Sequence, residues 1–391
     1  MPDISIPSPL LVTVDDVGWW DGRDGSARNQ PFRTGMHRHH APEDYRALAA
    51  LGKALHMRIP AGFVLCEWDQ ANALRSLPSA TWMGHQWQTP FRNRAQLEAA
   101  ASIINEAAPY IEPALHGVGH EFWIDGRMDR SEFHNSDGRM RHPDEVEKHL
   151  EFFFRLMAQN HLDSDVRIFM PPALNHGFGK GPSGFQKIAA SFGIRYVSLA
   201  FDRARCHVPP QLKNVGWENR VVLMDRGPSP VDWNRVAPAP VLNPDQPVLP
   251  LHWANILHED PQKNMPVVTA WVKTINGQLN ENGRLPARDM GQCLTQYLHC
   301  TQSRIERQGC DIIVHMDWIG KIPEDALADS VFFSVKQDSE FNIVGVEKMA
   351  PSTPGQAAFL RVGLPASGKI VFQSATSGKA GGLFVNRSKR S

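Results

Sequence analysis

Short apolar segments alternate with longer amphipathic segments from about residue 10 to about residue 310, and this alternation limits the fold more than any other feature. Seven short segments have the apolar character of buried strands: 10–15, 59–66, 111–116, 166–170, 195–200, 220–224 and 248–252. Strand–helix alternation is typical of a parallel sheet or a (β/α) barrel. We therefore predict an α/β fold, and specifically a distorted (β/α) barrel.

The segments between these strands have helical periodicity. Pro42, Glu43 and Asp44 open one such segment, because proline fits the first helical position and acidic side chains there complement the helix dipole. The apolar positions that follow recur at helical spacing. We predict helices over about 42–56, 94–108, the segment after Pro143, 261–280 and 287–308.

The sequence changes character after about residue 328. Short β-rich runs separated by Gly, Pro and Ser replace the helical segments, at 331–335, 342–348, 357–363, 370–373 and 382–386. A chain of 391 residues also exceeds what one core usually holds. We predict a barrel domain over 1–325 and a small β-rich domain over 326–391 that ends in a flexible basic tail.

Charge and composition exclude several classes of partner. The chain has 41 basic and 41 acidic residues and no long basic run, which argues against nucleic-acid binding. No window approaches the ~20 apolar residues of a membrane span. The first residues lack the features of a secretory signal, so we expect a cytoplasmic protein, or a secreted or periplasmic one if a leader has been trimmed. The sequence does not indicate an oligomeric state.

Polar residues gather where the predicted strands end. Asp15 and Asp16 end the first strand, His116 ends the third, and His120 follows four residues later. In such folds the active site lies at the C-terminal ends of the strands. Adjacent carboxylates can point in different directions, so one can bind a metal while the other acts as a base, and two imidazoles can complete the ligand set. This pattern favours a hydrolytic metal site.

Five motifs stand in order over about residues 10–255: Thr13-Val-Asp15-Asp16, His116-Gly-Val-Gly-His120, Arg167-Ile-Phe-Met-Pro171-Pro172, Asp232-Trp233 and Val248-Leu-Pro-Leu-His252. Taken together they resemble the motifs of the NodB-type polysaccharide deacetylases, the fourth carbohydrate-esterase family. The resemblance implies a NodB-type barrel in which Asp15 is the catalytic base and His252 the general acid. It implies that Asp16, His116 and His120 bind one divalent metal. Zinc is favoured for this mixed ligand set, and cobalt, nickel, iron or manganese also accept it.

Two positions depart from the family pattern. Gly117 stands where the family has a hydroxyl residue, and Met170 stands where it has an arginine that pairs with the base. Asp225 is an alternative to Asp232 as the fourth-motif carboxylate. These departures indicate an outlying member.

Other residues near the motifs are candidates for binding substrate. Tryptophans beside a polar site can stack on sugar rings. We expect a substrate-binding wall formed by Trp19, Trp20, Trp123, Arg167, Pro171, His176, Asp232 and Trp253. The loop His37-Arg-His-His40 is expected to be solvated or to contact substrate.

The expected function is metal-dependent removal of an acetyl group from an N-acetylated amino sugar in a poly- or oligosaccharide. An O-acetyl sugar esterase, or a hydrolase of another C–N amide, would use the same barrel. An inactive carbohydrate-binding protein is the alternative from a different class.

Overall fold

The computed structural model describes residues 4–179, 181, 184–207, 214–335, 341–344, 348–349 and 359–374. The chain divides into two compact units. The larger unit comprises Ser8–Leu294 and Ile322–Leu327, and the smaller unit comprises Met1–Pro7, Thr295–Lys321 and Ala328–Ser391. The chain passes between the units after Pro7, after Leu294 within a helix, after Lys321 and after Leu327, and the last two places lie close to the boundary expected from composition near residue 325.

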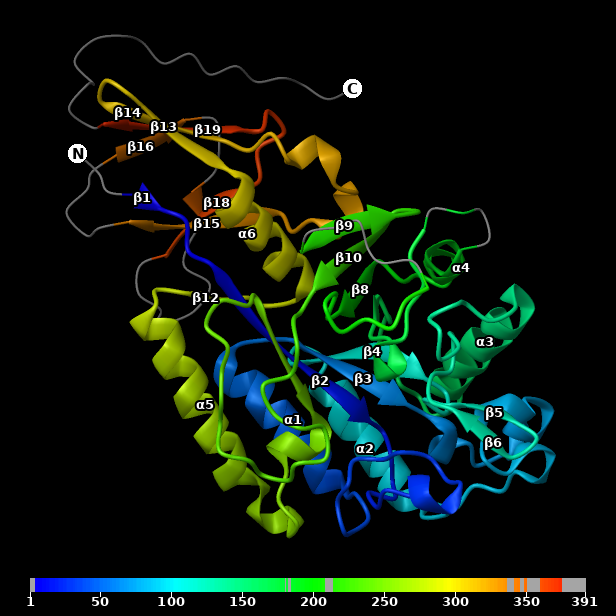
Figure 1. Ribbon diagram of the computed structural model, residues 1–391. Helices are drawn as coiled ribbons and strands as arrows, with labels where there is room; N and C mark the ends of the chain where they lie inside the picture. Colours follow the sequence, from blue (N-terminus) through cyan, green and yellow to red (C-terminus); the bar gives the residue numbers. More distant parts are fainter. Residues whose placement is uncertain are drawn as a thin grey trace. The chain divides into compact units, whose positions relative to one another are not determined.

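A nine-stranded sheet forms the centre of the larger unit (Figure 1). Its order is β11-β2-β3-β4-β7-β8-β10-β9, and β12 also pairs with β2. The strands are β2 (Pro9–Val17), β3 (Ile59–Val64), β4 (Ile111–Gly117), β7 (Ile168–Phe169), β8 (Tyr196–Leu199), β9 (Val215–Glu218), β10 (Val221–Asp225), β11 (Val248–His252) and β12 (Leu285–Pro286). All neighbours from β11 to β10 are parallel, and only β9 is antiparallel to its neighbour.

This sheet confirms the predicted mixed α/β fold. All seven predicted strands are present, and their order follows the chain except that β11 returns to pair with β2. The sheet is curled and resembles half of a barrel, so a distorted barrel is compatible with it. Because the strands are parallel, their C-terminal ends meet at one edge, where the polar residues of the motifs lie.

Helices cover the outer face of this sheet. They are α1 (Pro42–Leu55), α2 (Arg94–Glu106), α3 (Pro143–Gln159), α4 (Phe185–Ser191) and α5 (Asn264–Glu281), and α6 (Met290–Gln302) contains the division between the units. Figure 1 shows α1 beside α5, and the two helices pack against each other. The apolar face of α1, formed by Tyr45, Leu48, Leu51 and Leu55, is buried as its periodicity indicates.

Several short elements of the larger unit were not predicted. They include α4, the edge strands β9 and β12, and the hairpin of β5 (Phe122–Ile124) and β6 (Arg127–Asp129). The hairpin turns at Asp125 and Gly126, which both have positive φ angles. No helix in the part of the chain that the structure describes is long and apolar enough to cross a membrane.

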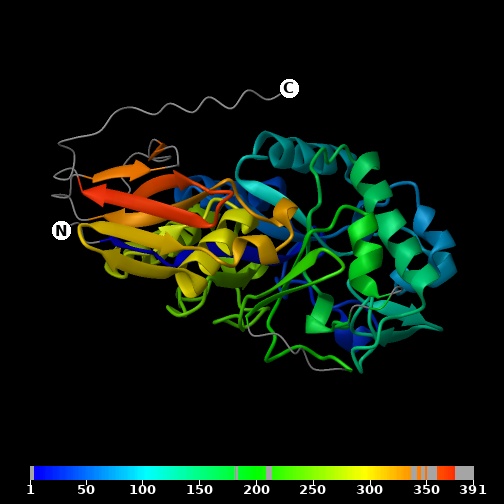
Figure 2. The same cartoon turned by 90° about the horizontal axis from the view of Figure 1, so that it is seen from above.

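The smaller unit consists largely of two four-stranded antiparallel sheets, with the orders β1-β15-β18-β17 and β13-β14-β19-β16. Figure 2 shows their yellow to red strands. The bounds are β1 (Ile4–Ser5), β13 (Arg304–Gln308), β14 (Asp311–His315), β15 (Ser330–Val335), β16 (Phe341–Val344), β17 (Lys348–Met349), β18 (Phe359–Gly363) and β19 (Lys369–Ser374).

One helix prediction was wrong at its end. The helix predicted over 287–308 stops at Gln302, and residues 304–308 form β13, which pairs with β14 through a turn at Gly309. The strand pairing outweighs the local helical pattern there. The predicted run 382–386 lies outside the described residues.

Candidate metal centre

A β-bulge at the end of β2 sets the directions of the two adjacent carboxylates. Val14 pairs with Ala61 and Val17 pairs with Phe63, so β2 has one more residue than β3 over this stretch. Asp16 lies in the bulge with φ 64°, a left-handed conformation that is uncommon outside glycine. Bulges redirect side chains, and this one brings the Asp16 carboxylate to the same edge of the sheet as Asp15.

A second bulge lies in β4, at the first histidine. Phe63 pairs with Leu115 and Val64 pairs with Gly117, which leaves His116 as the extra residue. His120 follows the strand and has φ 65°. The His116 and His120 Nε2 atoms lie 3.3 and 3.8 Å from Asp16 Oδ1.

Asp16, His116 and His120 form a buried group that can hold a metal ion. One ligand atom from each residue lies within 4.8 Å of the others. His116 Nδ1 donates to the Met170 carbonyl oxygen at 2.6 Å, and His120 Nδ1 lies 3.0 Å from Glu121 Oε1. Each Nδ1 atom has a hydrogen-bond partner outside this group of three residues, and each Nε2 atom is directed towards Asp16. This arrangement is typical of metal-binding histidines. The side chains present therefore fit a divalent cation with mixed N/O ligands.

A buried carboxylate holds the turn that carries His120. Glu132 accepts hydrogen bonds from the backbone N–H groups of Val118, Gly119 and His120 at 3.0, 2.9 and 2.9 Å. His149 of α3 lies 2.7 Å from the same carboxylate. This arrangement fixes the second histidine ligand through three backbone bonds.

The same carboxylate explains why glycine stands at position 117. Gly117 has φ 129°, and a Cβ atom there would lie 2.3 Å from Glu132 Oε2. A serine or threonine would therefore clash with the carboxylate that holds the turn.

Asp15 pairs with an arginine from another strand end. Arg226, directly after β10, donates from Nη1 and Nη2 to both carboxylate oxygens at 2.8 and 2.6 Å. Burial favours the neutral acid, but the adjacent guanidinium more than offsets this and lowers the pKa of Asp15. Arg226 thus supplies a positive charge beside Asp15, and Asp15 is ionised at neutral pH.

His252 lies beside Asp15 at the end of β11. The two residues are direct partners in the parallel ladder between β11 and β2. Desolvation of the ring lowers the pKa of His252, although Asp16 and Asp15 act in the opposite direction. Its Nδ1 atom is buried and has no hydrogen-bond partner among the described residues.

One cavity of about 560 Å³ brings these residues together. The five predicted metal and catalytic residues line it: Asp15, Asp16, His116, His120 and His252. Pro171 and Asp232 also line it, as predicted, together with Trp233 and Phe32. Asp225 instead accepts hydrogen bonds from the backbone N–H groups of Phe201 and Gly227, so Asp232 is the fourth-motif carboxylate that faces the cavity.

Four tryptophans predicted to form a sugar-facing wall do not line this cavity. Trp19, Trp20 and Trp253 are fully buried, and Trp20 stacks on Phe91. Trp123 lines a separate groove beside the β5–β6 hairpin. Closeness in sequence to a site residue does not determine the direction of a side chain, and the structure does not bring these four tryptophans to the metal cavity.

Two further predicted substrate residues also lie elsewhere. Arg167 precedes β7, away from the C-terminal strand ends, and donates to the Tyr196 hydroxyl at 3.1 Å. His176 is buried, and its Nε2 lies 2.9 Å from Gln186 Nε2. Neither lines the cavity.

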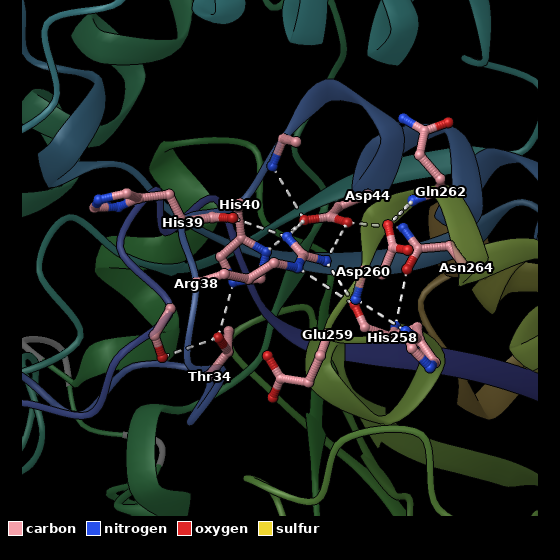
Figure 3. A network of polar contacts seen from close by, with 12 residues as sticks. Thr34, Arg38, His39, His40, Asp44, His258, Glu259, Asp260, Gln262 and Asn264 are labelled. Carbon is pink, nitrogen blue, oxygen red and sulfur yellow. Dashed lines mark hydrogen bonds and ion pairs between the residues drawn. The ribbon is translucent and has the colours of Figure 1, made fainter.

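The loop over 37–40 joins a structural network rather than the cavity. His40 is buried, lies 2.8 Å from Thr34 Oγ1 and 2.9 Å from Asp44 Oδ2, and stacks on Trp253. Figure 3 shows Arg38 beside the same Asp44 carboxylate, to which it donates at 2.7 and 2.8 Å. The network fixes the start of α1 and the residue after His252.

Sequence reasoning missed several residues of the site. Arg226 follows a predicted strand, so the rule that identified Asp15 would also have found it. Glu132 has no comparable local signal, because its partners are twelve to fourteen residues away.

No protein-family model matches the chain, and no curated protein matches it either.

Proposed function

We propose that the protein is a metal-dependent hydrolase of the NodB type that removes the acetyl group of an N-acetylated amino sugar. The observation that carries the proposal is the cavity in which Asp16, His116 and His120 converge beside Asp15 and His252. These residues supply three ligands, and one carboxylate and one imidazole outside the ligand set.

Each of these residues has a separate task. When bound, a divalent cation such as zinc supplies a Lewis acid for the acyl carbonyl and lowers the pKa of a ligated water towards ~7. Asp15 takes a proton from the attacking water, and Arg226 keeps this carboxylate ionised and oriented. The new C–O bond forms as the C–N bond breaks, and His252 gives a proton to the leaving amine.

The cavity wall supports a sugar as the acyl carrier. Trp233 and Phe32 line the cavity, and both rings are only partly buried. Aromatic faces of this kind are suited to stacking on the C–H face of a sugar ring. The wall thus comes from residues other than the tryptophans expected at first.

The test is metal analysis of purified protein, combined with acetate release from N-acetylated and O-acetylated glycans. We expect about one divalent cation per chain and acetate release that a chelator abolishes. His120→Ala should lose both. His142→Ala is the matched control, because its side chain is 69% exposed and is not part of the ligand group. Full metal occupancy in His120→Ala would contradict the ligand assignment.

A second comparison separates the base from the ligand. Asp15→Asn should retain the metal and lose about 10²–10⁴-fold in turnover, since it removes proton transfer alone. Asp16→Asn should lose metal affinity. If Asp15→Asn loses the metal, or keeps its turnover, the roles assigned to the two aspartates are wrong. Release from O-acetylated glycans alone would identify an esterase.

A further inference from the structure

Arginines dominate the charged lining of the metal cavity. Five arginines line it: Arg33, Arg130, Arg203, Arg205 and Arg226. Two are neutralised within the protein. Arg226 pairs with Asp15, and Arg33 pairs with the buried Glu67 at 3.1 Å. The other three are Arg130, Arg203 and Arg205.

Arg130 lies in the cavity and makes no ion pair with any described residue, although the buried carboxylate of Glu121 acts on its charge. It follows the β5–β6 hairpin, and its guanidinium carbon lies 3.5 Å from the centroid of the Phe32 ring. Its Nε atom is buried and has no hydrogen-bond partner in the part of the chain that the structure describes. The ring contact fixes the plane of the guanidinium and leaves its donors available.

Arg205 adds a second unpaired charge to the same wall. Its backbone forms an isolated β-bridge with Asn175. Its side chain is exposed and makes no ion pair with any described residue. Arg203 differs, because Asp202 lies 3.7 Å from it. Burial lowers the pKa of Arg130, Glu121 and Asp16 oppose this, and the nearby positive charge of Arg205 lowers it further.

The acidic residues of the cavity do not neutralise this wall. Asp15 is already paired with Arg226, and Asp16 belongs to the metal-ligand group. Asp232 is exposed and makes no ion pair among the residues described. A divalent cation on Asp16 would add positive charge to the cavity. An anion is therefore the complementary occupant.

We propose that the cavity binds a substrate that carries an anionic group, a carboxylate or a phosphate, which Arg130 and Arg205 hold near the metal ligands. This inference rests on the proposed function, and it makes the substrate an N-acetylated acidic sugar rather than a neutral one. Guanidinium groups suit both anions, because their planar forks donate two parallel hydrogen bonds.

The experiment compares three probes on the metal-loaded, full-length protein: N-acetylglucosamine, N-acetylglucosaminuronate and N-acetylglucosamine 6-phosphate. Binding is measured by calorimetry, and acetate release is measured in parallel. Wild type is compared with Arg130→Gln/Arg205→Gln and with Arg205→Gln alone, whose exposed position keeps the fold intact. Arg94→Gln, an exposed change on α2, controls for lost charge.

We expect at least one anionic probe to bind about tenfold or more tightly than the neutral sugar in wild type and Arg94→Gln, because hydrogen bonds between charged groups are the strong ones. The double variant should lose this preference, and Arg205→Gln should lose part of it. The two anions identify which group the wall prefers.

Equal binding of neutral and anionic probes, or a preference that survives in both arginine variants, would overturn the inference. Acetate release without a preference for charge would overturn it and leave the proposed function standing. An arginine-dependent preference without any acetate release would support anion recognition and count against the deacetylase proposal.

Discussion

Replacing Arg226 with methionine tests whether the folded protein depends on a counter-charge for Asp15. The guanidinium donates to both carboxylate oxygens, and the two side chains are 5% and 3% exposed. Methionine keeps an extended side chain but leaves the buried carboxylate unpaired. Breaking a buried ion pair in this way costs about 3–5 kcal/mol. We expect Arg226→Met to lower the free energy of unfolding by that amount at neutral pH.

The pH dependence of this loss follows from the pKa of Asp15. In the wild type this pKa is lowered, so the pair stabilises the fold above the unfolded pKa of ~3.9 and ceases to do so as the pH falls through the folded value. In Arg226→Met, burial remains without the guanidinium, so the pKa of Asp15 rises and the acid becomes neutral at a higher pH. The stability difference should therefore be largest at neutral pH and narrow towards pH ~4.

Urea unfolding in the presence of a chelator measures these differences without interference from bound metal. Asp15→Asn and the double variant Asp15→Asn/Arg226→Met complete a double-mutant cycle, in which the double variant should recover part of the loss. Arg203→Met is the control, since that arginine is 65% exposed and should cost little. A loss below about 1 kcal/mol, or one that is equal at pH ~4 and pH ~7, would refute the reasoning.

Three further predictions concern the metal ligands and the acid. Glu132→Gln should weaken metal affinity about 10–100-fold, measured by competition with a chelator, because it loosens the turn that holds His120. Gly117→Ser should destabilise the protein in thermal unfolding, since its Cβ would lie 2.3 Å from Glu132 Oε2; a stable variant would contradict the proposed clash. If His252 must be protonated, kcat/KM should fall as the pH rises through a pKa below the ordinary ~6.5, and His252→Ala should remove that limb of the profile.

The sequence was sufficient to place the ligand and catalytic candidates, for a physical reason. Asp15, Asp16, His116 and His252 each end a strand with a strong apolar pattern, and parallel strands bring their ends to one edge. The residue types and their positions at strand ends therefore indicate the same site, and no knowledge of tertiary contacts is needed to see this. The NodB type and the activity remain proposals.

The wall of the cavity could not be predicted in the same way. Trp19, Trp20 and Trp253 are close in sequence to site residues but point into the core. Arg130 reaches the cavity directly after a short hairpin, and the Asp125-Gly126 turn signals that hairpin without indicating where the side chain after it points. The orientation of such side chains depends on loops and tertiary contacts, which a single-sequence pattern does not contain.

The left-handed conformations of Asp16 and His120 place backbone strain beside the ligand atoms. Such a conformation costs about 1–2 kcal/mol at a non-glycine residue. The bulge of β2 and the hydrogen bonds to Glu132 offset this cost within the fold. In the ion-free protein, the amide protons that Glu132 holds should exchange with solvent faster than those within β4, since this turn stores strain that the strand does not.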